Sequence, residues 1–278
     1  MHIKKIIEES IVAIFSDNEL SKQLVLKGGG ALQFLEGKDE RLSIDIDFSI
    51  RQVLFEPEEF FRKIEQALTN QFESLEYDVI DFKYQAKPKA AEKNPTWWRG
   101  WLCEFKLSTC KHRSDTLIMR RRAALIPEGS NSSKIEIEIS EHEYCNSTRR
   151  KSISGIMVEG YTREALVLEK MRAICQQHPT YEYSKRTKNR ARDFVDIYSL
   201  TLNFDDAFLE ACKIHIEFIF EAKKVPLKLL SCYWDEEFIE IQRRGFAEVV
   251  DSLKKKAYPF DVYLEHLRYF TKALLPSL

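Results

Sequence analysis

The stretch that decides the fold is LKGGGALQFLEGKDERLSIDIDF, residues 26–48. Its second half belongs to the segment Leu42–Ile50, which alternates polar and apolar residues and therefore predicts a β-strand. Successive side chains of a strand point to opposite faces, so Asp45 and Asp47 share one face while their apolar neighbours face a core. Two adjacent carboxylates repel each other unless a cation lies between them, and Mg²⁺ or Mn²⁺ meets that need. We expect a metal site here, although a half-exposed edge strand would show the same pattern.

Three consecutive glycines upstream strengthen this expectation. They follow a short apolar run at Gln23–Leu26, predicted as a strand, and precede a predicted short helix at Ala31–Leu35. Gly28, Gly29 and Gly30 allow the backbone to approach a ligand closely, and the N-terminus of a helix directs N–H groups at anions such as phosphates. The run lacks the GxxxxGK[ST] continuation of a P-loop, which makes a P-loop NTPase unlikely. The glycine run and the strand that carries Asp45 and Asp47 together indicate a site that binds a metal ion and a nucleotide.

A third carboxylate is expected from a neighbouring strand. The segment Lys134–Ser140 alternates in the same way and places Glu136 and Glu138 on one face. Either glutamate could complete the metal site, and a half-solvated strand would also explain the pattern. Three carboxylates around two Mg²⁺ would align the α-phosphate of an NTP with an incoming hydroxyl and stabilise the departing pyrophosphate. The pattern favours an enzyme that transfers nucleotides.

The C-terminal half carries a lysine and two aspartates where helices would bury them. Lys170 lies inside the apolar arc of a predicted helix at Arg163–Cys175. On the next predicted helix, Arg190–Leu202, Asp193 lies on the core-facing arc and Asp196 at its margin. A buried lysine needs an anion, so we expect Lys170 to contact Asp193 or a phosphate. A purely structural ion pair would satisfy the same pattern.

Charge limits the ways in which the chain could bind nucleic acid. Lys and Arg number 43 and Asp and Glu number 44, so the formal net charge is -1 and there is no global basic field. The densest basic cluster consists of Lys185, Arg186, Lys188, Arg190 and Arg192. This cluster could attract the phosphate backbone of RNA, or it could be a solvated surface.

Two domains are expected along the 278 residues. The first, residues 1–160, combines predicted helices at 3–16 and 57–72 with strands at 77–86, 99–109 and 134–140, and a loop at Lys87–Pro95. The second, residues 161–278, is all-helical, with helices expected at 162–177, 188–202, 206–223, 235–256 and 259–274. The fold class is therefore α+β.

Membrane insertion and secretion are not expected. No stretch of about 18 apolar residues occurs, so no membrane-spanning segment is predicted. The N-terminal segment carries Glu8 and Glu9 where a signal peptide would be apolar. We therefore expect a cytoplasmic protein.

Five separate elements together resemble the AbiEii/AbiGii toxin family of nucleotidyltransferases. They are Lys27–Leu32, Arg41, Ser43–Phe48, Glu164–Leu166 with Lys170, and Arg190–Asp196. The resemblance covers about residues 20–205. It implies a polymerase-β-like nucleotidyltransferase domain with a mixed sheet, followed by a helical domain. It also implies a toxin of an abortive-infection or toxin–antitoxin pair with a cognate antitoxin, and some members transfer nucleotides from an NTP to the acceptor end of tRNA.

The resemblance also implies roles for individual residues. Catalytic roles fall to Asp45, Asp47, Lys170 and Asp193. Nucleotide binding falls to Lys27, Gly28, Gly29, Gly30, Ser43, Arg190 and Asp196. This chain has Gly30 where the family often has Ser or Thr, and Arg192 where it usually has Lys, which keeps the charge but not the geometry.

Residues and resemblance lead to one main hypothesis and two alternatives. The main hypothesis is a Mg²⁺-dependent transfer of a nucleotide from an NTP to RNA, with the 3′ end of tRNA as acceptor. The first alternative is the same chemistry on a hydroxyl of a protein or a small molecule. The second is a binding module that retains the fold without catalysis, which would bind its partner equally well with and without Mg²⁺.

Overall fold

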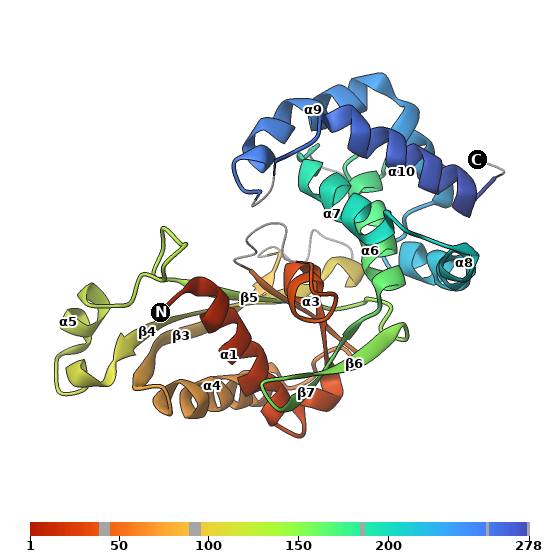
Figure 1. Ribbon diagram of the computed structural model, residues 1–278. Helices are drawn as coiled ribbons and strands as arrows, with labels where there is room; N and C mark the ends of the chain where they lie inside the picture. The colour runs from red at the N-terminus through yellow and green to blue at the C-terminus, as the bar shows by residue number, and fades with distance from the viewer. Residues whose placement is uncertain (39–44, 89–95, 184–186, 254–255, 277–278) are drawn as a thin grey trace. The chain divides into compact units, whose positions relative to one another are not determined.

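The computed structural model describes residues 1–38, 45–88, 96–183, 187–253 and 256–276 (Figure 1). These residues form two compact units. The first contains Met1–Gly37 and the described residues from Asp45 to Tyr161, and the second contains Lys38 and the described residues from Thr162 onward.

A mixed sheet organises the first unit. In the described residues it has seven strands in the order β3-β4-β5-β2-β1-β7-β6. The strands are β1 (Leu24–Lys27), β2 (Ile46–Ile50), β3 (Tyr77–Lys87), β4 (Gly100–Thr109), β5 (Ile135–Ser140), β6 (Thr148–Ile153) and β7 (Ile156–Tyr161). The pairs β2–β5 and β1–β7 are parallel and the others antiparallel. The predicted α+β class with a mixed sheet is confirmed.

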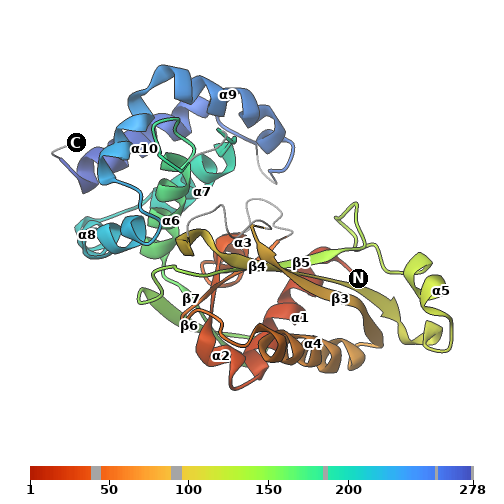
Figure 2. The same ribbon diagram turned by 180° about the vertical axis from the view of Figure 1, so that it is seen from behind.

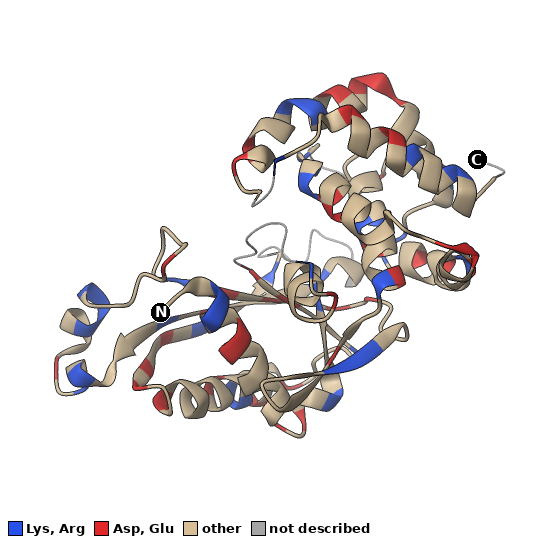
Figure 3. Ribbon diagram, viewed as in Figure 1, with Lys and Arg blue, Asp and Glu red and all other residues tan. Residues whose placement is uncertain are grey.

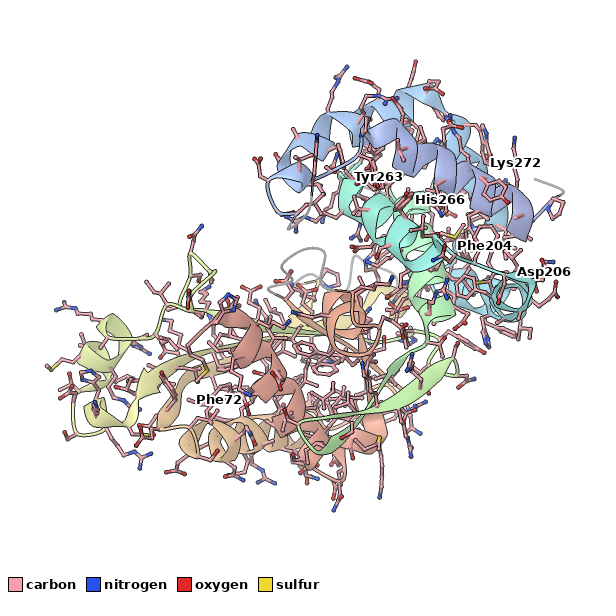
Figure 4. All side chains as sticks on the ribbon, in the orientation of Figure 1. Phe72, Phe204, Asp206, Tyr263, His266 and Lys272 are labelled. Atoms are coloured by element: carbon pink, nitrogen blue, oxygen red, sulfur yellow. The ribbon has the colours of Figure 1, made fainter. Side chains whose placement is uncertain are left out.

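Helices cover one face of this sheet. The helices of the unit are α1 (Ile3–Ser16), α2 (Leu20–Gln23), α3 (Gly28–Phe34), α4 (Pro57–Glu73) and α5 (Leu117–Arg122), with short 3-10 turns at Thr96–Trp98 and Cys110–His112. Figures 1 and 2 show α1 and α4 on the same side of the sheet. The ring of Phe15 in α1 lies 6.1 Å from that of Phe48 in β2, and the ring of Phe72 in α4, which Figure 4 labels, lies 6.0 Å from that of Phe105 in β4.

The alternation of buried and half-buried side chains in β2 and β5 follows from this packing. The three isoleucines of β5 are buried, and the glutamates between them are half-buried. Because Phe48 contacts α1, the apolar face of the sheet is the one that α1 and α4 cover, and Asp47 projects from the opposite face. The face that bears the carboxylates is thus separated from the helical layer by the sheet itself.

Two parts of this unit differ from the sequence-based prediction. The glycine run does not form a turn before a helix, because α3 already begins at Gly28, whose φ of 59° lets the chain pass directly from β1 into the helix. The β6–β7 hairpin was not predicted, since Arg149-Arg150-Lys151 in β6 lacks apolar alternation. These cations lie on an edge strand, visible in blue in Figure 3, where charge prevents unwanted strand pairing. The predicted loop at Lys87–Pro95 lies largely outside the described residues, and Lys87 ends β3.

The second unit is helical in its described part. Its helices are α6 (Arg163–Cys175), α7 (Ala191–Thr201), α8 (Asp206–Glu221), α9 (Glu236–Val250) and α10 (Phe260–Leu274), with a 3-10 helix at Leu227–Trp234. Phe194 of α7 lies at its centre, with ring distances of 5.0 Å to Phe260 and 6.5 Å to Tyr233. No described helix of the chain combines the length and the apolar character needed to cross a membrane.

Side chains rather than backbone alone fix the ends of these helices. Thr162 caps α6 and Asp205 caps α8, each accepting a hydrogen bond from a backbone N–H of the first turn. At the end of α7, Thr201 lies 2.8 Å from Nε2 of His266 in α10, and burial lowers the pKa of this imidazole. Figure 4 shows His266 beside Phe204, whose ring centre is 6.5 Å away. The contact joins α7 to α10.

Candidate active site

A row of charged side chains crosses three adjacent strands of the sheet. Asp47 in β2 is in register with Lys27 in β1 on one side and with Glu138 in β5 on the other. Directly opposed residues of paired strands point to the same face, so the three side chains share the face opposite α1 and α4. The order of charges along the row is positive, negative, negative. Two carboxylates from separate strands therefore lie beside each other.

The register distinguishes the two candidate glutamates. Glu138 is the neighbour of Asp47, whereas Glu136 is in register with Glu104 of β4. Lys83 and Lys134 each bind Glu104 at 2.7 Å and hold the pKa of its carboxyl below the ordinary value. Glu136 thus faces an ion-pair network on the side of β4.

A second lysine pairs with Glu138 from outside this row. Nζ of Lys87, at the end of β3, lies 2.6 Å from Oε1 of Glu138. Lys87 is in register with Gly100 of β4, which is in register with Ser140 of β5. Because Gly100 has no side chain, none lies between Lys87 and β5 at this position. Sequence reasoning missed Lys87, because only the pairing of strands 51 residues apart brings it to Glu138. The signal available was a lysine at the start of a predicted loop, directly after a predicted strand, and such a lysine is too common to assign.

The carboxylates fit a site that is completed by substrate. In the part of the chain that the structure describes, no three His, Cys, Asp or Glu side chains gather closely enough to hold a metal ion by themselves. Mg²⁺ is usually held by one or two carboxylates together with water and substrate phosphates. Asp47 and Glu138 supply two such oxygen donors, and Asp45 is exposed immediately before β2. The donor set therefore suits Mg²⁺ or Mn²⁺ in the presence of a phosphate ligand.

Gly28 lies directly against the carboxylate of Asp47. A Cβ atom at Gly28 would stand 2.1 Å from Oδ2 of Asp47, and its φ of 59° is one that side chains rarely adopt. Gly29 is buried, and a Cβ at Gly30 would meet Cδ1 of Leu26 at 3.3 Å. Gly28 therefore requires glycine because of the carboxylate, while Gly30 packs toward the apolar core.

Lys27 and Ser43 were both predicted to bind nucleotide. Lys27 is 8% exposed, and its Nζ lies 3.1 Å from Oγ of Ser140 and 3.5 Å from Oε1 of Glu143. The lysine thus joins the end of β1 to the end of β5 and the residues after it. Ser43 lies outside the described residues.

The second unit contains a buried ion cluster. Nζ of Lys170 in α6 lies 3.2 Å from Oδ1 of Asp193 and 2.6 Å from Oδ2 of Asp196, both in α7. All three side chains are more than 90% buried. Arg190, at the start of α7, lies 3.5 Å from Oδ2 of Asp193 and is 43% exposed. The expected contact between Lys170 and Asp193 is present, and Asp196, expected at the margin of the helix, is buried and is the nearer partner.

The basic cluster is described only in part. Lys188, Arg190 and Arg192 are exposed, and Lys185 and Arg186 lie outside the described residues. Arg190 is the member of this cluster that contacts the buried ions.

Comparison with known proteins assigns the chain to a family. The model of a family described as "Nucleotidyl transferase AbiEii toxin, Type IV TA system" matches residues 10–266. No curated protein matches the chain. MenT4, a nucleotidyltransferase toxin from Mycobacterium tuberculosis, is similar in structure with a TM-score of 0.51 and 10% identity, covering 99% of this chain and 84% of its own. JHP933 from Helicobacter pylori has a TM-score of 0.48 and 18% identity, covering 98% of this chain and 91% of its own. Because the family match spans most of both units, the chain belongs to the AbiEii family of nucleotidyltransferase toxins of type IV toxin–antitoxin systems.

Proposed function

We propose that this nucleotidyltransferase uses a divalent metal ion to transfer a nucleotide from an NTP to RNA, with the 3′ end of tRNA as acceptor. The observation that carries the proposal is the pair Asp47 and Glu138, placed side by side by strand register and with Gly28 against Asp47. With these proposed substrates, we expect the reaction to take place in the cytoplasm. The toxin family implies a cognate antitoxin, which would oppose the toxicity of this protein.

The residues of the first unit have separate tasks in this proposal. Asp45, Asp47 and Glu138 would hold Mg²⁺, which would supply Lewis-acid polarisation of the phosphate under attack and charge stabilisation of the departing pyrophosphate. The absence of side chains at Gly28 and Gly29 lets phosphate approach the backbone N–H groups at the start of α3. Lys27 contributes a fixed positive charge beside Asp47, which lowers the repulsion between the carboxylates and a triphosphate.

In the second unit, Arg190 keeps its predicted role in binding nucleotide. We keep this role because its guanidinium is partly exposed while it touches the buried Asp193. Lys170 is enclosed by Asp193 and Asp196, so its charge is already matched by carboxylates and it fixes α6 against α7. The catalytic roles that the family resemblance assigns to Lys170 and Asp193, and nucleotide binding by Asp196, stay predictions.

Labelled nucleotides test the proposal directly. The purified protein is incubated with Mg²⁺, total tRNA and each α-³²P-labelled NTP in turn, and the products are separated on a denaturing gel. We expect label on tRNA with at least one NTP, and none when EDTA is present. Label on protein and never on RNA would support the alternative acceptor, and no label with any NTP would contradict the enzyme.

Two glutamates on the same face of β5 offer a matched pair of variants. Glu138→Gln removes a carboxylate beside Asp47, whereas Glu136→Gln removes one beside Glu104. We expect Glu138→Gln to lower the rate of transfer by about 100-fold or more and Glu136→Gln by less than about threefold. Initial rates at saturating Mg²⁺ measure both. Equal losses in the two variants would contradict the assignment of Glu138.

Gly28→Ala should also inactivate the protein. The added methyl group would overlap Oδ2 of Asp47 and force the carboxylate out of place, so we expect the rate of transfer to fall by about 100-fold. Gly37→Ala is the control, because Gly37 has a φ of 67° and its Cβ would meet nothing within 4 Å. Both substitutions carry a similar backbone cost of roughly 1–2 kcal/mol, so thermal unfolding should respond to both. A comparable loss of activity in Gly37→Ala would mean that strain, rather than the overlap with Asp47, is responsible.

A further inference from the structure

A fully buried glutamine of α9 holds the segment that leads into α7. Gln242 has no exposed surface. Its Oε1 accepts a hydrogen bond of 2.6 Å from the backbone N–H of Arg190, and its Nε2 donates one of 3.4 Å to the carbonyl of Lys188. One side chain thus satisfies both a donor and an acceptor of a segment 52 residues away along the chain. Burying an amide group is costly without such partners, so the position of Gln242 is tied to this segment.

Asn189 fixes the same segment from the other direction. Its Nδ2 donates to two carbonyls of α9, at 3.0 Å to Ile241 and 3.1 Å to Gln242. Its Oδ1 accepts a hydrogen bond of 2.9 Å from the N–H of Ala191, the first residue of α7. A Cβ at Gly245 would lie 1.8 Å from Nδ2 of Asn189, so a glycine is required where the asparagine rests on α9.

These contacts end at the residue that the proposed function assigns to the nucleotide. The N–H of Arg190 is held by Gln242, and its guanidinium lies 3.5 Å from Oδ2 of Asp193. Oδ1 of Asp193 in turn accepts a hydrogen bond from Nζ of Lys170. With its backbone held on one side and its guanidinium directed by an aspartate on the other, Arg190 loses little conformational entropy when it binds an anion.

We propose that Gln242, Asn189 and Gly245, together called the α9 clamp, are positioning residues that hold Arg190 in place for nucleotide binding. This inference rests on the proposed function. The clamp residues touch the backbone of the Arg190 segment and bind no phosphate themselves. Because they act before the nucleotide arrives, their loss should weaken nucleotide binding and leave the chemical step almost unchanged.

Two substitutions disturb the clamp in opposite ways. Gln242→Met keeps the volume of the side chain and removes both hydrogen bonds to the segment. Gly245→Ala adds a methyl group that displaces Asn189, while alanine itself favours the helix. Val249→Ala is the control, because Val249 is another buried residue of α9 and its truncation loosens the core alone. We expect both clamp variants to raise KM for the NTP by about tenfold with kcat within about twofold, and Val249→Ala to change neither.

Hydrogen exchange separates failure of this inference from failure of the proposed function. Amide exchange of the peptide spanning residues 187–196 should accelerate about tenfold in both clamp variants and not in Val249→Ala. If the wild-type protein transfers no nucleotide, the proposed function fails, and exchange still decides whether the clamp holds the segment. Unchanged exchange would overturn the clamp. Faster exchange with unchanged KM would show a purely structural contact and would also overturn the positioning role.

Discussion

Asp47→Asn should reduce nucleotide transfer by about 1,000-fold while the protein stays folded. Asparagine preserves the shape of the side chain, so its fit against Gly28 is retained and the strand register around it should not change. What is lost is the negative charge at the centre of the row formed with Lys27 and Glu138. A neutral amide oxygen is a poor substitute for a carboxylate beside Mg²⁺. Initial rates with the labelled NTP and tRNA measure the effect.

Metal binding gives this prediction a second readout that does not depend on the acceptor. Mn²⁺ can be titrated with protein and a non-hydrolysable NTP analogue, and the free ion followed by electron paramagnetic resonance. We expect Asp47→Asn to weaken Mn²⁺ binding by about tenfold or more, and Glu136→Gln to leave it unchanged. Wild-type rates in Asp47→Asn would contradict the metal site, and lost activity with unchanged Mn²⁺ binding would assign Asp47 a role other than metal ligand.

The local pattern of the carboxylate strand could be predicted from sequence because it depends only on neighbouring residues. Alternation of side chains is a property of one strand, so the shared face of Asp45 and Asp47 needs no knowledge of the rest of the fold. The choice between Glu136 and Glu138 could not be made in this way. It depends on the register of β5 against β2, two strands that lie about 90 residues apart in the sequence. A slip of one residue in this pairing would move every side chain of the strand to the other face.

Other differences have equally specific physical causes. The glycine run was predicted as a turn because tight turns need the conformational freedom of glycine, yet α3 begins at Gly28, which has a positive φ and lies against Asp47. The clamp residue Gln242 gave no signal, because a glutamine within a helix normally lies in solvent. Lys170 and Asp193 were found because a charge inside an apolar arc is itself unusual. Sequence reasoning therefore succeeds where a residue violates its local pattern, and fails where an ordinary residue acquires a partner only through the tertiary fold.

Lys170→Met should destabilise the protein by about 3–5 kcal/mol. The substitution retains most of the volume of the side chain, so little packing is lost. It leaves Asp193 and Asp196 without the cation that binds both, in a region where each carboxylate is more than 90% buried. Arg190 remains 3.5 Å from Asp193, whereas Asp196 loses the ammonium that lies 2.6 Å from its Oδ2. Urea unfolding, followed by circular dichroism, measures the change.

Removing the carboxylates together with the lysine tests whether buried charge is the cause. In the triple variant Lys170→Met/Asp193→Asn/Asp196→Asn the buried lysine and both buried carboxylates are replaced by neutral side chains, and the guanidinium that loses Asp193 is 43% exposed. We therefore expect the triple variant to recover more than half of the stability lost in Lys170→Met. An exposed lysine supplies the comparison: Lys213 pairs with Glu210 at 2.7 Å on the surface of α8, and Lys213→Met should cost less than about 0.5 kcal/mol.

If Lys170→Met cost no more than Lys213→Met, the cluster would not hold α6 against α7. If the triple variant were as unstable as the single one, lost packing rather than unmatched charge would explain the effect. Recovery of stability without recovery of NTP binding would show that the cluster also serves the nucleotide through Arg190, because the asparagine at position 193 no longer attracts the guanidinium.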